Sequence, residues 1–294
     1  MSEPFFSIIV PTFNRAHLIG KTIKSVQNQG FESWELIVVD DGSTDATKEL
    51  IERLIVDDPR ITYLYQQNAE RSTARNLGIT QSKGEYVCFI DSDDLYLDNN
   101  LTDWHQFIST QTILPAFMYA NIRYRTWEEE KVVTTYRNGQ HLLNFLLTNP
   151  IVPSRVCISR SILEVHRFDP EVCICEDLTL WLKLANEYPV LEATHVASIY
   201  VVHDENSTAA GSRAPLIMLK GLTFFFNKYP AIRAKINTSV FKFYLSEVHT
   251  NVAKYYIHHG RKCKAFFHLV ISLLIAPKHK HTKYRLVTIK NLLF

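Results

Sequence analysis

The chain has 294 residues and an ordinary globular composition, in which 46% of the residues are hydrophobic and 21% are charged. Its net charge of +2 excludes the class of strongly acidic or strongly basic proteins. Its most apolar stretch, residues 265–276, is shorter than the roughly 20 residues that a membrane-spanning helix needs. The five cysteines form no CxxC pair, which favours a reduced, cytoplasmic protein.

The first 112 residues alternate between strand and helix patterns. The N-terminal segment is too short and too acidic for a signal peptide, and a strand begins almost at once. Strands are expected at residues 7–10, 36–39, 61–65 and 86–90, and helices at 17–29, 44–55 and 71–80. This alternation predicts right-handed βαβ units and therefore an α/β fold with a Rossmann-like, mainly parallel sheet flanked by helices.

Beyond residue 112 the pattern changes. A hairpin is expected from residues 117–127 and 132–136, and the segments around 94–115 and 138–176 are expected to contain specificity loops. Further strands are predicted at 156–159 and 195–202, and further helices at 139–147, 176–188, 216–229, 231–259 and 262–275.

Polar residues follow three of the predicted parallel strands. Residues 11–15 (PTFNR) follow the first strand, 40–45 (DDGSTD) the second and 91–94 (DSDD) the fourth. Because the carboxyl ends of parallel strands lie at one edge of a sheet, where open α/β sheets bind ligands, the three segments are predicted to meet at one site. Thr12 and Asp41 can hydrogen-bond a nucleobase, and a carboxylate accepts from an imide N–H such as that of uracil.

The third of these segments is the most acidic. Asp91, Asp93 and Asp94 repel one another, and hard carboxylate oxygens at this spacing suit Mg²⁺ or Mn²⁺ shared with the phosphates of a substrate. The alternative is an acidic turn that caps the next helix, but three acids exceed what one cap requires. We therefore expect a divalent cation at the end of the fourth strand.

Three further sets of residues are weaker evidence for a functional site. Arg75 can offset the acids or hold a ribose or phosphate oxygen, although surface arginines are common. Glu176 and Asp177 begin a helix with an apolar face, where a carboxylate can take a proton from an attacking hydroxyl, but the helix dipole alone also favours acids there. His203 is either a metal ligand beside Asp93 or an ordinary loop histidine.

Taken in order, five segments are similar to the motifs of glycosyltransferase family 2, whose members are inverting enzymes with the GT-A fold. The segments are residues 7–14 (SIIVPTFN), 38–45 (VVDDGSTD), 74–78 (ARNLG), 89–94 (FIDSDD) and the Glu-Asp pair at 176–177. The likeness covers roughly residues 5–205. It implies a GT-A catalytic domain over 1–210, with a nucleotide-binding half (1–112) and an acceptor half (113–210). The helical pattern from Pro215 onward predicts a basic helical extension over 211–294.

The resemblance also implies roles for individual residues. Asp93 would bind the divalent metal, with His203 close to it, and Asp177 would be the catalytic base. The residues that would bind the donor are Pro11, Thr12, Asn14, Asp41, Arg75, Asp91, Asp94 and Glu176.

The predicted activity is the metal-dependent, inverting transfer of a sugar from a nucleotide-diphosphate sugar, most often a UDP-sugar. The acceptor would be a hydroxyl of a glycan or a lipid-linked glycan, as in cell-surface polysaccharide synthesis. One alternative is a nucleotide-sugar-binding protein that has lost activity, against which the presence of Asp93 and Asp177 argues. The other is a sugar nucleotidyltransferase, which normally has a glycine-rich, lysine-containing loop that residues 11–15 lack.

Charge is distributed unevenly along the chain. No Asp or Glu follows Glu247, and subtracting the nine cations of this C-terminal part from the net +2 leaves −7 for residues 1–247. The nine are Lys254, Arg261, Lys262, Lys264, Lys278, Lys280, Lys283, Arg285 and Lys290. These cations predict a helix that lies on an anionic membrane surface, which would make the protein peripheral on the cytoplasmic membrane face. A helix that packs on the body of the protein, with its lysines in solvent, is an equal alternative. A nucleic-acid-binding tail ranks third, because no nucleic-acid module accompanies it.

Overall fold

The structure is a computed structural model that describes residues 3–56, 58–209, 211–278 and 282–293. The chain divides into two units. The sheet unit comprises residues 1–138, 151–170 and 183–202, and the helical unit comprises 139–150, 171–182 and 203–294. The predicted domain boundary at residue 210 and the predicted surface cation Lys280 lie outside the described residues.

The first half of the sheet is parallel, as the βαβ alternation predicts. Its strands are β1 (Phe6–Thr12), β2 (Trp34–Asp40), β3 (Ile61–Tyr65) and β4 (Tyr86–Phe89), and their order is β3-β2-β1-β4. All residues of β1 and β4 are buried, because helices cover both faces of the sheet. This is why these strands read as continuous apolar runs in the sequence.

The second half of the sheet is mixed. It contains β5 (Leu95–Tyr96), β6 (Phe117–Arg125), β7 (Glu130–Val133), β8 (Val156–Ser159) and β9 (Val190–Val201). β8 is antiparallel to both β4 and β6, β9 is parallel to β6, and β5 is antiparallel to β9. β6 and β7 form the predicted hairpin.

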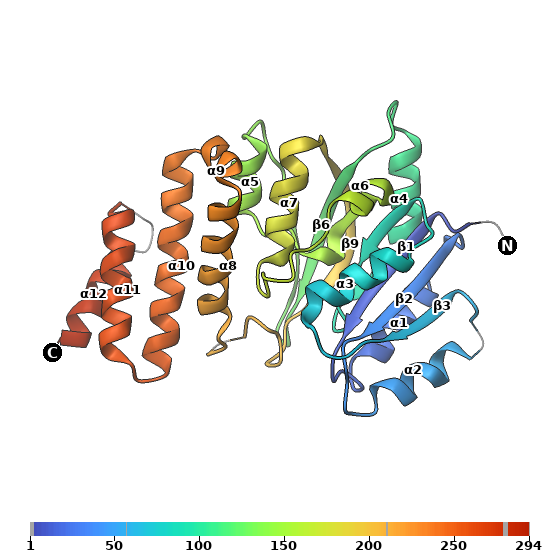
Figure 1. Cartoon of the computed structure of the whole chain (residues 1–294), viewed down its shortest axis with the longest axis horizontal. Helices are drawn as coiled ribbons and strands as arrows, with labels where there is room; N and C mark the ends of the chain where they lie inside the picture. Colours follow the sequence, from blue (N-terminus) through green and yellow to red (C-terminus); the bar gives the residue numbers. More distant parts are fainter. Residues whose placement is uncertain (1–2, 57, 210, 279–281, 294) are drawn as a thin grey trace. The chain divides into compact units, whose positions relative to one another are not determined.

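Helices cover the two faces of the parallel half. α1 (Ile19–Gln27), α2 (Thr47–Ile55) and α4 (Asn100–Ser109) pack on the face that includes Val10 and Val38. α3 (Glu70–Gln81) packs on the other face, against Ile37 and Val39, and lies across the strands in Figure 1. A Cβ at Gly78 of α3 would lie 2.5 Å from a methyl carbon of Ile9, so α3 approaches β1 more closely than an alanine there would allow.

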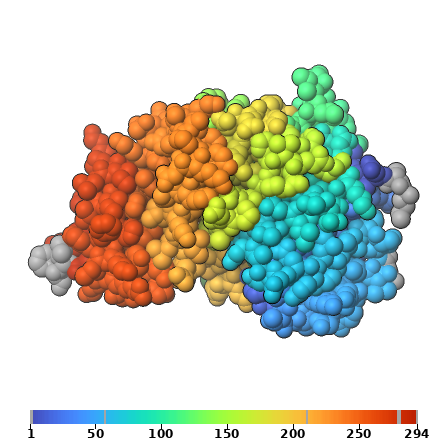
Figure 2. Space-filling view, viewed as in Figure 1, coloured from blue at the N-terminus to red at the C-terminus, as the bar shows by residue number. Residues whose placement is uncertain are grey.

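The helical unit consists mainly of helices that run side by side in Figure 1. They are α5 (Leu142–Thr148), the first part of α7 (Glu176–Glu187), α8 (Ala214–Lys228), α9 (Pro230–Lys235), α10 (Thr238–His258), α11 (Lys262–Ile275) and α12 (Thr282–Leu293). α10 packs against α5, α8 and α11, and α11 packs against α12. The space-filling view shows α10 and α11 in contact along the visible face (Figure 2).

Two expectations about secondary structure are corrected. The predicted helix over 231–259 is two helices, because the Asn237 side chain accepts from the N–H groups of Ser239 (2.8 Å) and Val240 (3.3 Å) and starts α10 anew. The predicted loops around 94–115 and 138–176 also contain α4, α6 (Arg160–Val165) and the short 3₁₀-helix Pro153–Arg155, whereas α5 confirms the helix predicted at 139–147. α12 lies within the helical extension predicted over 211–294, although no separate helix was predicted there. Among the described residues, every helix is too short or too polar to cross a bilayer.

Candidate active site

The carboxyl edge of the parallel strands brings the three predicted polar segments together. Thr12 is opposite Asp40 in the β1–β2 register, and the N–H of Asp41 donates to the carbonyl of Thr12 at 2.8 Å. On the other side of β1, the N–H of Ile90 donates to the carbonyl of Ile9 at 3.1 Å, so the acidic segment that follows Ile90 leaves the sheet at the same edge. The convergence follows directly from parallel pairing.

A buried hydroxyl and a buried carboxylate lie at the ends of β1 and β2. Thr12 is 3% exposed, and its Oγ1 makes no hydrogen bond within the structure. Asp41 is 5% exposed and accepts from the Gln66 side chain (2.6 Å) and the N–H of Ala69 (2.8 Å) through one oxygen, Oδ1. A buried polar atom without a partner is costly, and a bound ligand can satisfy it.

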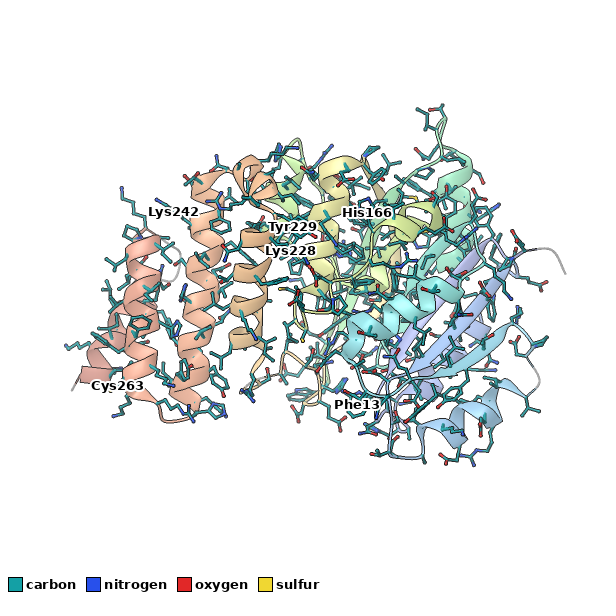
Figure 3. The ribbon with its side chains drawn as sticks, in the orientation of Figure 1. Phe13, His166, Lys228, Tyr229, Lys242 and Cys263 are labelled. Atoms are coloured by element: carbon teal, nitrogen blue, oxygen red, sulfur yellow. The ribbon has the colours of Figure 1, made fainter. Side chains whose placement is uncertain are left out.

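Asn14 joins the loops that follow β1 and β2. It has a left-handed backbone, with φ of 51°, and its Oδ1 accepts from the N–H of Thr44 at 2.8 Å while its own N–H donates to the Ser43 hydroxyl at 2.8 Å. The observed role of Asn14 is thus to fix the two loops, and its contact with the donor stays a prediction. Phe13, beside it, is 45% exposed at this edge of the sheet unit (Figure 3).

Arg75 and Asp91 form an ion pair next to these loops. Nη2 of Arg75 lies 2.7 Å from Oδ1 of Asp91, and the Arg75 side chain is 1% exposed whereas that of Asp91 is 29% exposed. The guanidinium also lies over the ring of Phe168 at 5.3 Å. Asn76 holds Phe168 in place, because its side chain both donates to the Phe168 carbonyl (2.9 Å) and accepts from the Phe168 N–H (3.0 Å).

Asp94 is buried behind the other two acids. It is 1% exposed, and its carboxyl group accepts from the Ser154 hydroxyl (3.0 Å) and from the N–H of Val201 (3.2 Å). Burial, and next the charges of Asp91 and Asp93, raise the pKa of Asp94 well above its usual range. The acids are therefore close enough to repel, as the sequence predicts.

This concentration of negative charge fits a divalent cation, which would offset the repulsion that Asp91 and Asp93 exert on Asp94. Among the described residues, however, no three His, Cys, Asp or Glu side chains are grouped as a complete metal site. The described side chains alone are therefore an incomplete ligand set; Mg²⁺ is usually held by one or two carboxylates together with substrate phosphates.

The predicted catalytic and histidine residues belong to the helical unit, whereas the donor residues from Pro11 to Asp94 belong to the sheet unit. Glu176 is 4% exposed, and Asp177 is half-buried at the start of α7, with Oδ1 accepting from the N–H of Leu178 at 2.7 Å. The backbone N–H of His203 donates to Oδ1 of Asn206 at 2.7 Å, and the ring lies within 3.1 Å of the same side chain. The catalytic role of Asp177 and the metal role of His203 stay predictions.

Several supporting residues were not predicted. Tyr63 donates to Asp40 at 2.8 Å, and Asn68 donates to the carbonyl of Asp41 at 2.9 Å. Gly42, with φ of 88°, leaves room for that contact, since a Cβ there would lie 2.8 Å from the backbone nitrogen of Asn68. Tyr63, Gln66 and Asn68 lie in or just after β3, so the position of the third strand was the available signal.

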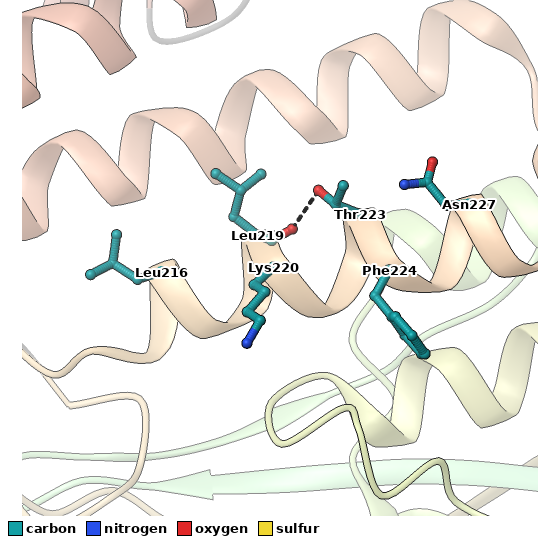
Figure 4. Close-up of a pocket in the computed structure, with 6 residues that line it drawn as sticks. All are labelled: Leu216, Leu219, Lys220, Thr223, Phe224 and Asn227. Carbon is teal, nitrogen blue, oxygen red and sulfur yellow. Dashed lines mark hydrogen bonds between the residues drawn. The ribbon is translucent and has the colours of Figure 1, made fainter.

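Two shallow hollows are lined by other residues. One, of about 430 Å³, is lined by a single face of α8, where the Thr223 hydroxyl donates to the Leu219 carbonyl at 2.8 Å (Figure 4). The other, of about 530 Å³, lies between α1 and β5 and includes Lys21 and Lys24. None of the residues that line either hollow is a predicted site residue.

Comparison with known proteins identifies relatives of the sheet unit. The profile of the family "Glycosyl transferase family 2" matches residues 7–164. The GalNAc(5)-diNAcBac-PP-undecaprenol beta-1,3-glucosyltransferase of Campylobacter jejuni is 46% identical over 194 residues, which cover 63% of this chain and 60% of that protein. The chain spans between 26% and 60% of the length of the first curated relatives that it matches.

Solved structures share the fold. S. aureus TarS 1-349 in complex with UDP-GlcNAc has a TM-score of 0.62 at 17% identity, with 92% of this chain and 91% of that chain covered. The mannosyltransferase PcManGT from Pyrobaculum calidifontis, in complex with GDP-Man and Mn²⁺, has a TM-score of 0.61 at 20% identity, with 100% and 82% covered. These likenesses confirm the predicted fold class, including the helices that follow the sheet.

Proposed function

Since this chain belongs to glycosyl transferase family 2, we propose that it transfers a sugar from a nucleoside-diphosphate sugar to a hydroxyl of a glycan, with inversion at the anomeric carbon. The observation that carries the proposal is the pair of polar groups at the ends of β1 and β2. The Thr12 hydroxyl is buried without a partner beside the buried carboxylate of Asp41, and together they can satisfy a nucleobase edge.

The donor base is uracil in this proposal. A carboxylate such as Asp41 accepts from the imide N–H of uracil, and the hydroxyl of Thr12 can donate to a carbonyl of the base. Arg75 and Asp91 hold the ribose or the sugar, because their ion pair lies beside the same loops. TarS, a structural neighbour, is solved with UDP-GlcNAc, and the Campylobacter relative is a glucosyltransferase, so UDP-glucose and UDP-GlcNAc are the first donors to test.

Asp93 would hold a Mg²⁺ or Mn²⁺ ion, with His203 as a second candidate ligand. When bound, such an ion stabilises the negative charge of the leaving nucleoside diphosphate. Burial is the main cause of the raised pKa of Asp94, and the charges of Asp91 and Asp93 add to it. That added repulsion supports a cation at this position, and PcManGT, another neighbour, is solved with Mn²⁺.

Asp177 is the general base of the proposed reaction. It takes the proton of the acceptor hydroxyl as the oxygen attacks the anomeric carbon from the face opposite the leaving group, which inverts the configuration. Asp177 is half-buried whereas its neighbour Glu176 is 4% exposed, so Asp177 is the better placed of the two to meet an acceptor.

The acceptor is a lipid-linked glycan in this proposal, because the Campylobacter relative is named for an undecaprenol-linked acceptor. The surface of α11 and α12 supports binding to an anionic membrane on the cytoplasmic side. Seven of the nine tail cations are exposed, and so are the apolar side chains Phe267 (60%), Leu274 (77%), Leu286 (54%) and Val287 (51%). Cations and apolar side chains on the same helices are typical of an interfacial surface.

Vesicle flotation tests the membrane part of the proposal. The protein is expected to float with vesicles containing phosphatidylglycerol at low salt and to stay unbound with pure phosphatidylcholine. Lys262→Glu combined with Lys264→Glu should abolish flotation, since both side chains are exposed at the start of α11. Lys21→Glu with Lys24→Glu changes the charge equally on exposed positions of α1 and is the matched control. If both pairs float equally, the helical surface is not the binding site.

A donor screen followed by a transfer assay tests the proposal itself. Thermal stability is measured with UDP-, GDP- and dTDP-sugars in the presence and absence of Mn²⁺, because a ligand that binds the folded state raises its stability. A UDP-sugar should give the largest shift, and the shift should decrease in Asp93→Asn only when Mn²⁺ is present. Stabilisation by a donor without transfer or donor hydrolysis would instead favour an inactive binding protein. Pyrophosphate release from a nucleoside triphosphate and a sugar phosphate would favour a nucleotidyltransferase.

A further inference from the structure

The segment that leads into Glu176 and Asp177 is packed into an apolar cluster of the helical unit. Val172 is 0% exposed and Cys175 is 6% exposed, and they form one cluster with Leu222 of α8 and Val248 of α10. α8 and α10 lie beyond residue 164, where the match to the family profile ends. The start of α7 thus rests on helices from the C-terminal part of the chain.

Gly221 of α8 allows the closest of these contacts. A Cβ at this position would lie 3.1 Å from Cγ1 of Val172, 3.3 Å from the carbonyl oxygen of Ile174 and 3.5 Å from Sγ of Cys175. The first two distances are shorter than ordinary van der Waals contacts, so any larger side chain pushes the 172–175 segment away from α8. Glycine has no special backbone conformation to provide inside this helix, and it costs about 1 kcal/mol of helix propensity relative to alanine. Close approach is therefore the physical reason for glycine here.

Cys175 makes the segment sensitive to such a push. Its φ of 66° is in the left-handed region, which is unfavourable for a residue with a Cβ. Its carbonyl accepts from the N–H of Thr179 at 3.0 Å and so begins α7. A backbone in this region persists only where the surrounding packing holds it, and here the packing comes from α8 and α10.

α10 also contacts the apolar cluster at the start of α7, through Tyr244. Its ring packs against the cluster, and burial, together with the nearby Cys175 and the carboxylates of Asp177 and Glu247, raises the pKa of the Tyr244 phenol. The side chain of Tyr244 is therefore near the carboxylate of Asp177 within the helical unit.

We propose that Gly221 and Val248 are positioning residues for Asp177: through Val172 and Cys175, α8 and α10 set where the carboxylate of Asp177 stands. The inference rests on the proposed role of Asp177 as general base. It makes the C-terminal helices a working part of the catalytic machinery, in addition to any role in membrane binding.

Gly221→Ala is the direct test. A displacement of the base by a few tenths of an ångström should lower kcat about 3- to 10-fold, since misplacement by 1 Å can cost about 100-fold. The KM for the donor and the thermal shift caused by the donor should stay unchanged, because the predicted donor-binding contacts of Thr12, Asp41 and Arg75 are in the sheet unit. Adding Val172→Ala removes Cγ1, the atom nearest to the new Cβ, and should restore part of kcat, since the contact with the Ile174 carbonyl remains.

Two alanine substitutions serve as controls. Gly20→Ala also replaces a helix glycine, but its Cβ would meet only ordinary contacts of 3.8 and 3.9 Å. Lys220→Ala changes the exposed neighbour of Gly221 on the face of α8 shown in Figure 4. Both variants should keep the kcat of the unmodified enzyme.

The outcomes separate this inference from the proposed function. If Asp177→Asn is inactive while folded Gly221→Ala keeps its full kcat, the positioning role is wrong and the base assignment stands. If Asp177→Asn is fully active, the base assignment itself is wrong, whatever Gly221→Ala does. Should Gly221→Ala fail to fold, Val248→Ala repeats the test from α10, with a lower kcat and an unchanged donor KM as the expected result; equal losses in both quantities would overturn the proposal.

Discussion

Two arginines, one in each unit, are equally buried but are compensated in different ways. Arg75 of the sheet unit is 1% exposed and lies 2.7 Å from the carboxylate of Asp91. Arg285 of the helical unit is 0% exposed, and its Nη1 donates to the Ser246 hydroxyl at 2.7 Å and to the carbonyl and hydroxyl of Ser272 at 2.9 Å each. One buried cation is matched by an acid and the other by neutral oxygens.

The difference teaches how to interpret the charges of the two regions. Asp91 is 29% exposed, so the Arg75 pair lies at the rim of the candidate site and is available to a ligand. Arg285 instead connects α12 with Ser246 of α10 and Ser272 of α11, and no acid follows Glu247 to pair with it. Burial lowers the pKa of Arg285, and Glu247 partly offsets this effect. Arg285 is thus a structural residue, although the sequence counts it among the cations of a surface.

The largest expected effect separates the two units by function. Asp177→Asn should lower the transfer rate by about 100-fold or more, because amide nitrogen and oxygen cannot accept the acceptor proton. Donor binding should be retained, since all predicted donor residues except Glu176 belong to the sheet unit. Transfer is measured with a radiolabelled UDP-sugar, and donor binding by calorimetry.

Asp93→Asn is the counterpart in the sheet unit and should weaken metal-dependent donor binding. If instead Asp177→Asn loses donor affinity and Asp93→Asn does not, the division between a donor-binding unit and a catalytic unit is wrong.

The next effect concerns acid stability in the sheet unit. Burial lowers the pKa of His195 to about 4, and its Nε2 has no hydrogen-bond partner in the part of the chain that the structure describes. The ring stands edge-on to Trp104, with the ring centroids 4.5 Å apart. Between pH 6.5 and 4 the unfolded chain binds a proton at His195 that the folded chain does not, so stability is lost as the pH falls through this window. The loss amounts to at most about 3 kcal/mol.

His195→Phe should remove this loss and leave stability at pH 7 unchanged or slightly higher, since an unsatisfied polar atom is replaced by an apolar edge. Urea unfolding at several pH values between 4 and 7 measures it. If the stability of the variant declines equally steeply with falling pH, other groups cause the acid sensitivity. The first candidate is His249 of the helical unit, whose pKa is lowered to about 4 by burial and by His268.

Arg285 offers a test of the structural role inferred from the comparison. Arg285→Ala should destabilise the helical unit by roughly 2–3 kcal/mol, because a long, fully buried side chain leaves a cavity. Arg285→Met should recover at least half of this loss, because it restores the volume and removes the cost of burying a charge. Hydrogen exchange of α10, α11 and α12 locates the change, and donor binding should be unaffected. A larger loss in the methionine variant would show that the charge itself is required.

The sequence predicts the candidate site better at the strand ends than elsewhere, for a physical reason. Parallel pairing alone brings Thr12, Asp41 and Asp91 to one edge of the sheet. Recognising the strands was therefore sufficient to predict that these residues meet. The partners of Asp94 could not be found in this way, because Ser154 is 60 and Val201 is 107 residues distant along the chain. Contacts of that kind depend on the antiparallel second half of the sheet, whose strand order no local pattern specifies.

In the helical unit, what the sequence could not predict is of a different kind. Its helices were largely predicted, since their apolar residues repeat with helical spacing. The break before α10 had a readable signal, because asparagine is a favoured N-cap and Asn237 precedes Thr238. The contact between Gly221 and Val172 had no signal in the sequence. It depends on how α8 packs, and a single glycine in a helical pattern does not indicate which residue approaches it.

The smallest expected effect tests how the donor loops are held. Asn14→Gly keeps the left-handed backbone but loses the hydrogen bond to Thr44, and Asn14→Ala loses both. The glycine variant should be about 1 kcal/mol less stable than the unmodified protein, and the alanine variant about 1 kcal/mol less stable still. The KM for the donor should rise only a few-fold, because the loops that carry Thr12 and Asp41 loosen while both side chains remain. If the donor KM rises more than tenfold in both variants with little change in stability, Asn14 binds the donor itself, and the loops owe their position to other contacts.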